Sequence, residues 1–366
     1  MVKPKGLFKF ALGAFAVLVL LVLPLRCWPE KERALQFRGV WVNAWGRGFK
    51  SPDEIDNLVE TAASAGLNAL LVQVRKRADA YYSSSIEPRA SDIPDGFDPL
   101  AELIPKAHRL GLEVHAWLVV YPAATGAEKS LPDGHILRRH PEWITRDADG
   151  NAMRRGDGEG LFLDPGLPEV QDYIVSVAVE LASRYDVDGI HLDYIRYPNR
   201  RWGYHPESVR RFTEETGCTP GENPTAWDNW RRQQVTLLVA RLKREIAKVR
   251  PGVKLSAAVF ADQSDAFKNR LQDWQRWLQH GWVDFVVPMN YVSNRSLFAS
   301  RSRQAYSRSR NVYMGVGVWN KPSEVAVSQL EFLKSMGVPG FVIYHYAAAD
   351  EAFWKALKAK VFAHGN

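Results

Sequence analysis

One short apolar stretch carries the residues best suited to acid–base chemistry. It covers residues 189–195 and holds a histidine and an aspartate two positions apart. Because successive strand side chains point to opposite faces, His191 and Asp193 share one face. A carboxylate at the end of a buried strand costs free energy unless it is paired or functional, and active sites of parallel α/β folds lie at the carboxyl ends of strands. We therefore take Asp193 as the candidate catalytic residue, with pairing to Arg75 or Arg196 as the structural alternative.

The elements that must position this aspartate follow a regular rhythm. Strand-like apolar runs occur at 37–45, 67–74, 112–120, 188–195, 253–260, 283–291, 312–318 and 340–346. Helical patterns lie between them, at 52–65, 99–110, 168–184, 225–249, 269–279 and 322–336, several with proline at the start and glycine at the end. Eight strands alternating with helices predict an α/β fold, a (β/α)8 TIM barrel over 34–366. An open doubly wound sheet is the rival, but no G-x-G-x-x-G follows the first strand.

Two long connections follow the third and fourth predicted strands. They cover residues 121–164 and 196–223, and they make the domain longer than the about 250 residues typical of this barrel. Both leave the carboxyl ends of their strands. We therefore expect them to shape a substrate cleft around Asp193.

Polar and aromatic side chains gather on one face at the carboxyl end of nearly every predicted strand, whereas the side chains on the opposite face are aliphatic. Flat aromatic walls with a few converging polar groups are typical of a ligand pocket, and such rings could stack on sugar rings. Aromatic filling of the barrel core is the plainer alternative. The candidate substrate-binding residues are Asn43, Trp45, Arg75, Trp117, His191, Arg196, Tyr197, Asn290, Tyr291, Trp319 and Tyr346.

Composition excludes several other classes of protein. The net charge of +7 comes from scattered basic pairs without a nucleic-acid-binding motif, which indicates a solvated surface and no nucleic-acid partner. The nine histidines form no metal-binding pattern, so we predict neither a metal nor another cofactor. No G-x-S-x-G elbow or P-loop occurs. With two cysteines, Cys27 and Cys218, a structural disulfide is not expected.

Residues 1–33 have the layout of an export signal. Lysines at positions 3, 5 and 9 precede an apolar run that extends to Leu25. No Ala-x-Ala-like cleavage site follows, and Arg26 stands where a lipoprotein signal needs a small residue before Cys27. We predict an exported cell-envelope protein held to the membrane by an uncleaved segment, with cleaved and lipidated forms as alternatives.

Several motifs resemble the glycosyl-hydrolase-like family 10 of bacterial cell-envelope proteins. They lie at 37–43, 67–75, 80–84, 97–100, 111–117, 140–143, 163–166 and 188–198, the last reading DGIHLDYIRYP from Asp188. The resemblance spans nearly all of 37–346. It implies a TIM-type barrel and glycoside hydrolysis, including cleavage of peptidoglycan glycan strands stripped of their peptides. We predict a polysaccharide as the partner and no obligate protein partner.

Glycoside hydrolysis usually needs two carboxyl groups flanking the bond, about 5–5.5 Å apart for retention and about 6.5–9.5 Å apart for inversion. Asp193 is the first of the pair. Asp262, just beyond the fifth strand, is the predicted second, and Glu87 and Asp164 on loops are the alternatives. A glycan-binding barrel without catalysis is a rival function. A lyase or aldolase ranks last, because it would need a lysine at a strand end.

Overall fold

The computed structural model describes residues 35–126 and 130–362. The predicted export segment at 1–33 lies outside these residues. Within the described part of the chain, no helix has the length and apolar character needed to cross a membrane.

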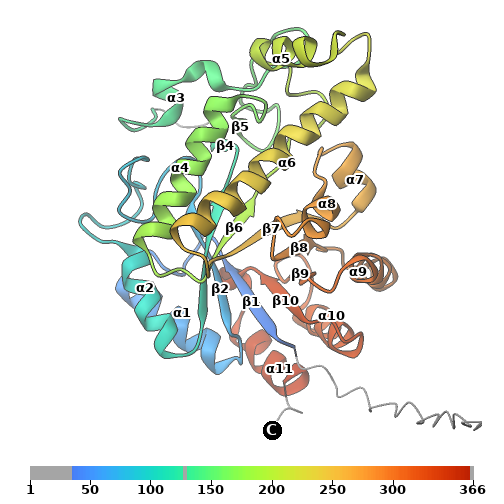
Figure 1. Ribbon diagram of the computed structural model, residues 1–366. Helices are drawn as coiled ribbons and strands as arrows, with labels where there is room; N and C mark the ends of the chain where they lie inside the picture. Colours follow the sequence, from blue (N-terminus) through green and yellow to red (C-terminus); the bar gives the residue numbers. More distant parts are fainter. Residues whose placement is uncertain (1–34, 127–129, 363–366) are drawn as a thin grey trace, which may run out of the picture. The chain divides into compact units, whose positions relative to one another are not determined.

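Eight parallel strands form a closed barrel (Figure 1), which confirms the predicted fold. The first strand pairs with the second along Gly39–Val42 and with the last along Phe37–Trp41, and this double pairing closes the ring. The barrel strands are β1 (Phe37–Val42), β2 (Ala69–Arg75), β3 (Glu113–Val119), β6 (Gly189–Asp193), β7 (Lys254–Phe260), β8 (Phe285–Met289), β9 (Met314–Gly317) and β10 (Gly340–Tyr344).

Helices lie between successive barrel strands, and their boundaries follow local capping. The Ser51 hydroxyl accepts from Glu54 N at the start of the first helix, and Asp98 accepts from Ala101 N at the start of the second. The helices are α1 (Pro52–Ser64), α2 (Pro99–Arg109), α4 (Pro168–Arg184), α6 (Pro224–Val249), α7 (Gln263–Lys268), α8 (Trp274–Gln279), α9 (Arg295–Arg308), α10 (Ser323–Ser335) and α11 (Glu351–Val361). The helix predicted at 269–279 is shorter, because Leu271 has a left-handed φ of 54° that interrupts the helical path.

The two long connections carry small elements of their own. The first holds β4 (Pro122–Ala124) and β5 (Leu161–Phe162), which pair antiparallel, with α3 (Ile136–Arg139) and the 3-10 turn η1 (Pro141–Trp143) between them. The second holds α5 (Pro206–Thr216), where no helix was predicted; His205 caps its start and Gly217 ends it in the left-handed conformation. A further 3-10 turn, η2 (Tyr346–Ala348), follows the last strand.

The barrel interior is filled by one parity of strand side chains. Small residues make room for the aromatic rings: a Cβ on Gly315 would approach the Trp41 ring to 3.1 Å. The strand side chains that point outward pack against the helices in a separate core. The interior cluster comprises Phe37, Trp41, Ala69, Leu71, Trp117, Ala258, Phe285, Val287 and Val342.

Candidate active site

A cleft of about 340 Å³ opens at the carboxyl ends of the barrel strands. Six of the side chains predicted for the site meet in it: Trp45, Trp117, Asp193, Arg196, Tyr291 and Trp319. Residues that were not predicted complete the lining, namely Trp41, Gln73, Arg77, Val119, Glu159, Tyr194, Ala258, Phe260, Met289 and Tyr344. The cleft thus brings side chains from strand ends together with Glu159 of the first long connection.

Asp193 ends β6 at the bottom of this cleft and is 8% exposed. Its Oδ1 accepts from the Tyr194 backbone N–H at 2.7 Å, and its Oδ2 accepts from Trp117 Nε1 at 3.2 Å. Burial raises the pKa of Asp193 to about 6, which outweighs the lowering by the Tyr194 N–H and the Arg196 charge. A carboxyl with this pKa keeps its proton near the pH at which it must donate it, as a general acid requires.

The backbone after Asp193 is bent in an uncommon way. Tyr194 has a φ of 53°, a left-handed conformation that costs a non-glycine residue on the order of 1–3 kcal/mol. This bend turns the Tyr194 N–H back onto the Asp193 carboxyl, and the Arg196 N–H closes the turn onto Tyr194 O at 2.9 Å. The strained turn therefore fixes the orientation of the candidate acid.

The raised pKa of Asp193 makes stability depend on pH. The folded state binds a proton more tightly than the unfolded chain, whose aspartate titrates near its ordinary value of 3.8. The stabilisation by this group is therefore fully present below pH 3.8 and is lost as pH rises through about 6, an effect on the order of 3 kcal/mol. We expect the unfolding free energy of wild type, relative to Asp193→Asn, to decline from pH 4 to pH 7 in urea titrations. Parallel curves for the two proteins would contradict the raised pKa.

A second carboxylate, Glu159, reaches the cleft from the first long connection. Its Oε2 accepts from Arg196 Nη2 at 2.6 Å, and its backbone oxygen accepts from Arg77 Nη2 at 3.2 Å. The neighbouring Gly160 has a φ of 129°, and a Cβ there would meet Ala124 O at 2.7 Å, so only glycine lets the loop lie this close to β4. The negative charge of Glu159 contributes to the raised pKa of Asp193, whereas the charge of Arg196, which is ion-paired with Glu159, lowers it.

Aromatic rings form the walls of the cleft. Tyr291, Trp319 and Tyr344 lie in mutual contact, with ring centroids 4.8–5.1 Å apart. Trp45 and Trp319 remain 57% and 47% exposed, an unusual exposure for such large rings. Flat, exposed apolar surfaces beside polar groups suit the faces of sugar rings.

Gly317 sets the position of Trp319. A Cβ on Gly317 would lie 2.4 Å from the Trp319 ring, so Gly317→Ala must displace that indole. We expect KM for a glycan substrate to rise about fivefold, roughly 1 kcal/mol, with kcat nearly unchanged. Steady-state kinetics of the two proteins check this, with Gly252→Ala, an exposed site with open space, as the control. An equal KM would show that the ring does not bind substrate.

His191 supports the floor of the cleft from below and does not line it. Trp41 Nε1 donates to His191 Nε2 at 3.0 Å, and Nδ1 lies 2.9 Å from Ser256 Oγ. Because an indole N–H can only donate, Nε2 is the acceptor and the proton is on Nδ1. Full burial holds the pKa of His191 well below its ordinary value. His191 is thus a neutral residue that positions Trp41, not a substrate-binding residue as predicted.

Arg75 and Glu87, predicted as a substrate-binding residue and an alternative acid, pair with each other away from the cleft. Arg75 Nε donates to Glu87 Oε1 at 2.7 Å, and Arg75 Nη1 donates to Val120 O at 2.9 Å. Tyr173 also contacts Glu87, and both charged side chains are fully buried. A register shift between Gln73 and Arg75 accounts for the error, because the irregularity breaks the strand's alternation.

Four other predicted residues also lie outside the lining of the cleft, and three of them make structural hydrogen bonds. Asp164, the other alternative acid, is buried and accepts from Thr145 Oγ1 at 2.8 Å and Ser208 Oγ at 3.0 Å, which joins the two long connections. Asn290 follows β8 on its outward parity and donates to Phe298 O at 3.0 Å. Asn43 shapes the turn after β1 by accepting from two backbone N–H groups, and Tyr197 is fully buried outside the cleft.

Asp262 does not line this cleft. Its Oδ1 caps α7 by accepting from Ser264 N and Asp265 N, and its Oδ2 lies 3.3 Å from Arg301 Nη2. These N–H groups and the Arg301 charge hold the pKa of Asp262 below its usual range, despite opposing desolvation. It borders an adjoining hollow of about 520 Å³. Asp262 therefore does not share the cleft with Asp193, whereas Glu159 does.

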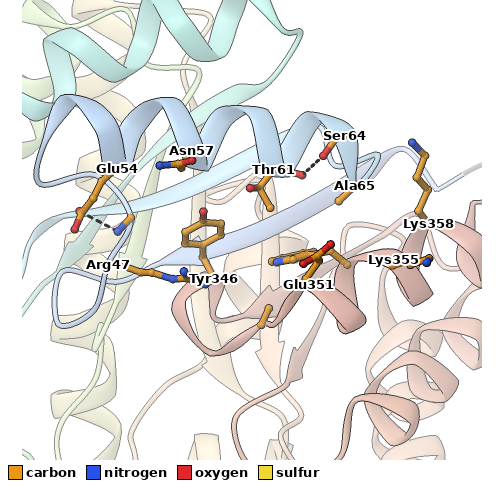
Figure 2. A pocket seen from close by; sticks show the side chains of 13 residues that line it. Arg47, Glu54, Asn57, Thr61, Ser64, Ala65, Tyr346, Glu351, Lys355 and Lys358 are labelled. Carbon is orange, nitrogen blue, oxygen red and sulfur yellow. Dashed lines mark hydrogen bonds between the residues drawn. The ribbon is translucent and has the colours of Figure 1, made fainter.

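Tyr346 lies in a different hollow, on the outer wall of the barrel. Figure 2 shows it between α1 and α11, where Arg47, Glu54 and Lys355 also project. This groove of about 700 Å³ has a mostly charged and polar lining. Tyr346 is 5% exposed and packs beneath Arg47, 5.7 Å from ring centroid to guanidinium. It therefore does not contribute to the cleft around Asp193.

A closed parallel barrel with a buried acid, a second carboxylate and aromatic walls at its strand ends is a glycosidase-type barrel. Residues 36–319 match the Glycosyl hydrolase-like 10 family, and the chain belongs to that family. This confirms the resemblance that the strand motifs indicated.

Two relatives share this region. The chain is 27% identical to glycosyl hydrolase YngK of Bacillus subtilis (strain 168) over 322 residues, covering 79% of this chain and 60% of that protein. It is 28% identical to glycosyl hydrolase DigH of Escherichia coli (strain K12) over 273 residues, covering 65% and 57%. The chain thus spans about three-fifths of the length of these relatives.

Two solved structures share this fold. The glycoside hydrolase domain of PgaB (BpsB) from Bordetella bronchiseptica superposes with a TM-score of 0.72 at 16% identity, covering 90% of this chain and 99% of that one. Alpha-L-fucosidase isoenzyme 2 from Paenibacillus thiaminolyticus gives 0.63 at 16% identity, covering 90% and 49%. At this identity the likeness shows the fold alone.

Proposed function

We propose that this protein hydrolyses glycosidic bonds in a cell-envelope polysaccharide, with Asp193 as the general acid and Glu159 as the second carboxylate. The observation that carries the proposal is the buried Asp193 carboxyl, whose pKa is raised to about 6 at the floor of an aromatic cleft. Two carboxyls in unlike surroundings are what acid-catalysed glycoside cleavage requires.

Each carboxyl has a distinct task in this mechanism. Asp193 gives its proton to the glycosidic oxygen as the bond from that oxygen to the anomeric carbon breaks. Glu159, ion-paired to Arg196 at 2.6 Å, stabilises the positive charge that develops on the sugar ring. A water molecule then supplies the hydroxyl of the new reducing end, and its proton restores the acid. Trp117 and the Tyr194 N–H keep the Asp193 carboxyl oriented throughout.

We propose peptide-free glycan strands of peptidoglycan as the substrate. The family resemblance in the strand motifs suggests this class, and the cleft offers a suitable charge. The Arg77 guanidinium lines the cleft, and within the described residues it donates only to the backbone oxygens of Lys76 and Glu159. Its charge is thus available to a carboxylate on the sugar. A cell-envelope location is part of the same proposal and rests on the signal-like residues 1–33.

The test is release of reducing ends by the purified domain from a panel of glycans that includes peptide-free peptidoglycan strands and neutral polysaccharides. We expect wild type to release new reducing ends from the peptidoglycan strands. Arg77→Gln should lower the activity on carboxylate-bearing glycan more than it lowers the activity on neutral glycan. Binding without turnover of any glycan would instead support a non-catalytic glycan-binding barrel. Absence of both binding and turnover would contradict either function.

A further inference from the structure

The cleft around Asp193 adjoins the hollow that contains Asp262. The two share Phe260, Met289 and Tyr291 as lining residues, and all three are partly exposed. A ligand that reaches these side chains from Asp193 is therefore already at the edge of the second hollow. That hollow continues outward between the ends of β7 and β8 and the helices α7 and α9, which lie on the same side of the barrel (Figure 1).

The order of strands sets the direction of this extended surface. Trp45 follows β1, whereas Asp262 follows β7. The strands β2, β3 and β6 separate β1 from β7 on one side of the ring, and β8, β9 and β10 separate them on the other. Trp45 and the Asp262 hollow therefore stand on opposite sides of the barrel mouth, and Asp193 lies on the route between them.

The second hollow offers polar groups that remain available to a ligand. Asp262 Oδ1 is committed to the α7 cap, but Oδ2 makes only a long contact of 3.3 Å with Arg301, and the Asp262 side chain is 46% exposed. Among the described residues, Arg301 has no other hydrogen bond or ion pair. A loosely paired carboxylate and guanidinium beside the Tyr291 ring can bind sugar hydroxyls.

We infer that the two hollows form one binding trench across the barrel mouth, which holds several sugars of a polymeric glycan and directs cleavage to internal bonds. This inference rests on the proposed function. A chain that passes over Asp193 with sugars bound on both sides presents a bond within the chain. An enzyme acting on chain ends would need one side of the mouth closed, and here Trp45 on one side is 57% exposed and the Asp262 hollow opens on the other.

Binding tests the trench without turnover. In the Asp193→Asn background, calorimetry gives the affinity for peptide-free peptidoglycan strands of six sugars and of two. We expect the six-sugar strand to bind at least about tenfold more tightly than the two-sugar strand. Arg301→Gln should reduce this ratio of affinities about fivefold. Asp262→Asn, which keeps a helix-capping side chain, should reduce it as well. Arg303→Gln, an exposed position on the same helix that lines neither hollow, is the matched control.

The pattern of products gives the second measurement. With wild type, the mean strand length should fall early while monosaccharides and disaccharides stay scarce. Release of single sugars or disaccharides from the outset, or a ratio unchanged by Arg301→Gln, would overturn the inference while leaving the proposed hydrolysis intact. If the affinity ratio depends on Arg301 but wild type shows no turnover, the proposed hydrolysis and the internal cleavage would both be contradicted. The trench would then remain as a binding surface.

Discussion

Asp193→Asn is expected to lower the rate of glycan hydrolysis about 10³-fold, because an amide cannot deliver a proton to the glycosidic oxygen. Asparagine has the same shape and can still accept the Tyr194 N–H, so the fold should persist. Reducing-end assays on wild type and variant measure the loss. Asp350→Asn is the control, since the side chain of that residue caps α11, away from the cleft, and asparagine caps equally well. A variant that keeps a tenth of the wild-type rate would rule out Asp193 as the acid.

The wild-type rate should also fall as pH rises above about 6. Asp193 must be protonated to act as the acid, and its pKa is raised to about 6 by burial. A pH profile of kcat on peptide-free glycan strands checks this directly. A rate that increases from pH 6 to pH 8 would assign the ionised form of Asp193 to catalysis, as a nucleophile rather than an acid.

Glu159→Gln should lower kcat by about 10²–10³-fold, because the developing positive charge would lose its carboxylate. It should also move the descending limb of the pH profile below about pH 6. Glu159 adds to the raising of the Asp193 pKa by burial, so removing its charge should lower that pKa. A residue with only a structural role in the loop would not move this limb.

Two further variants make the Glu159 experiment decisive. Asp157→Asn changes an acid in the same loop that does not line the cleft and should leave kcat unchanged. Asp262→Asn should affect binding of long chains far more than kcat. If Asp262→Asn abolished turnover and Glu159→Gln did not, the catalytic pair would be Asp193 and Asp262 after all.

The barrel could be predicted from sequence because each of its strands is a continuous apolar run bounded by helix signals. Parity was also correct for the fourth predicted strand: Asp193 lines the cleft, and His191, on the same face, contacts Trp41 inside the barrel. The same reasoning applied to Asn290 would have placed it outward, since Met289 beside it faces the cleft. The alternation of residues along a strand thus predicts which way each side chain points, as long as the strand is regular.

The prediction failed where regular alternation ends. Arg75 lies at a register shift in β2, and this irregularity is invisible in the sequence. Asp262 stands two residues beyond the strand end predicted at 260, and there the start of α7 requires a capping side chain. Both residues have the right type and approximate height in the barrel. Because of the local backbone, however, both side chains bind structural partners instead of lining the cleft.

Glu159 was missed because its position depends on tertiary contacts of a long loop. The loop reads Gly156-Asp157-Gly158-Glu159-Gly160, and no strand end predicts where it lies. Its glycines were the available signal, since Gly160 permits the close approach to Ala124 O. An acid flanked by glycines, in a connection expected to cover the cleft, would have been a reasonable candidate for the second carboxylate.

Closure of the ring by β1 and β10 also determines which fragments can be expressed. The family match ends at residue 319, whereas β10 and α11 begin at Gly340 and Glu351. A protein truncated at 319 would leave β1 and β9 with unpaired edges, which are templates for aggregation. Boundaries for recombinant work should therefore extend past Val361, so that the first strand keeps its partner and the product stays soluble.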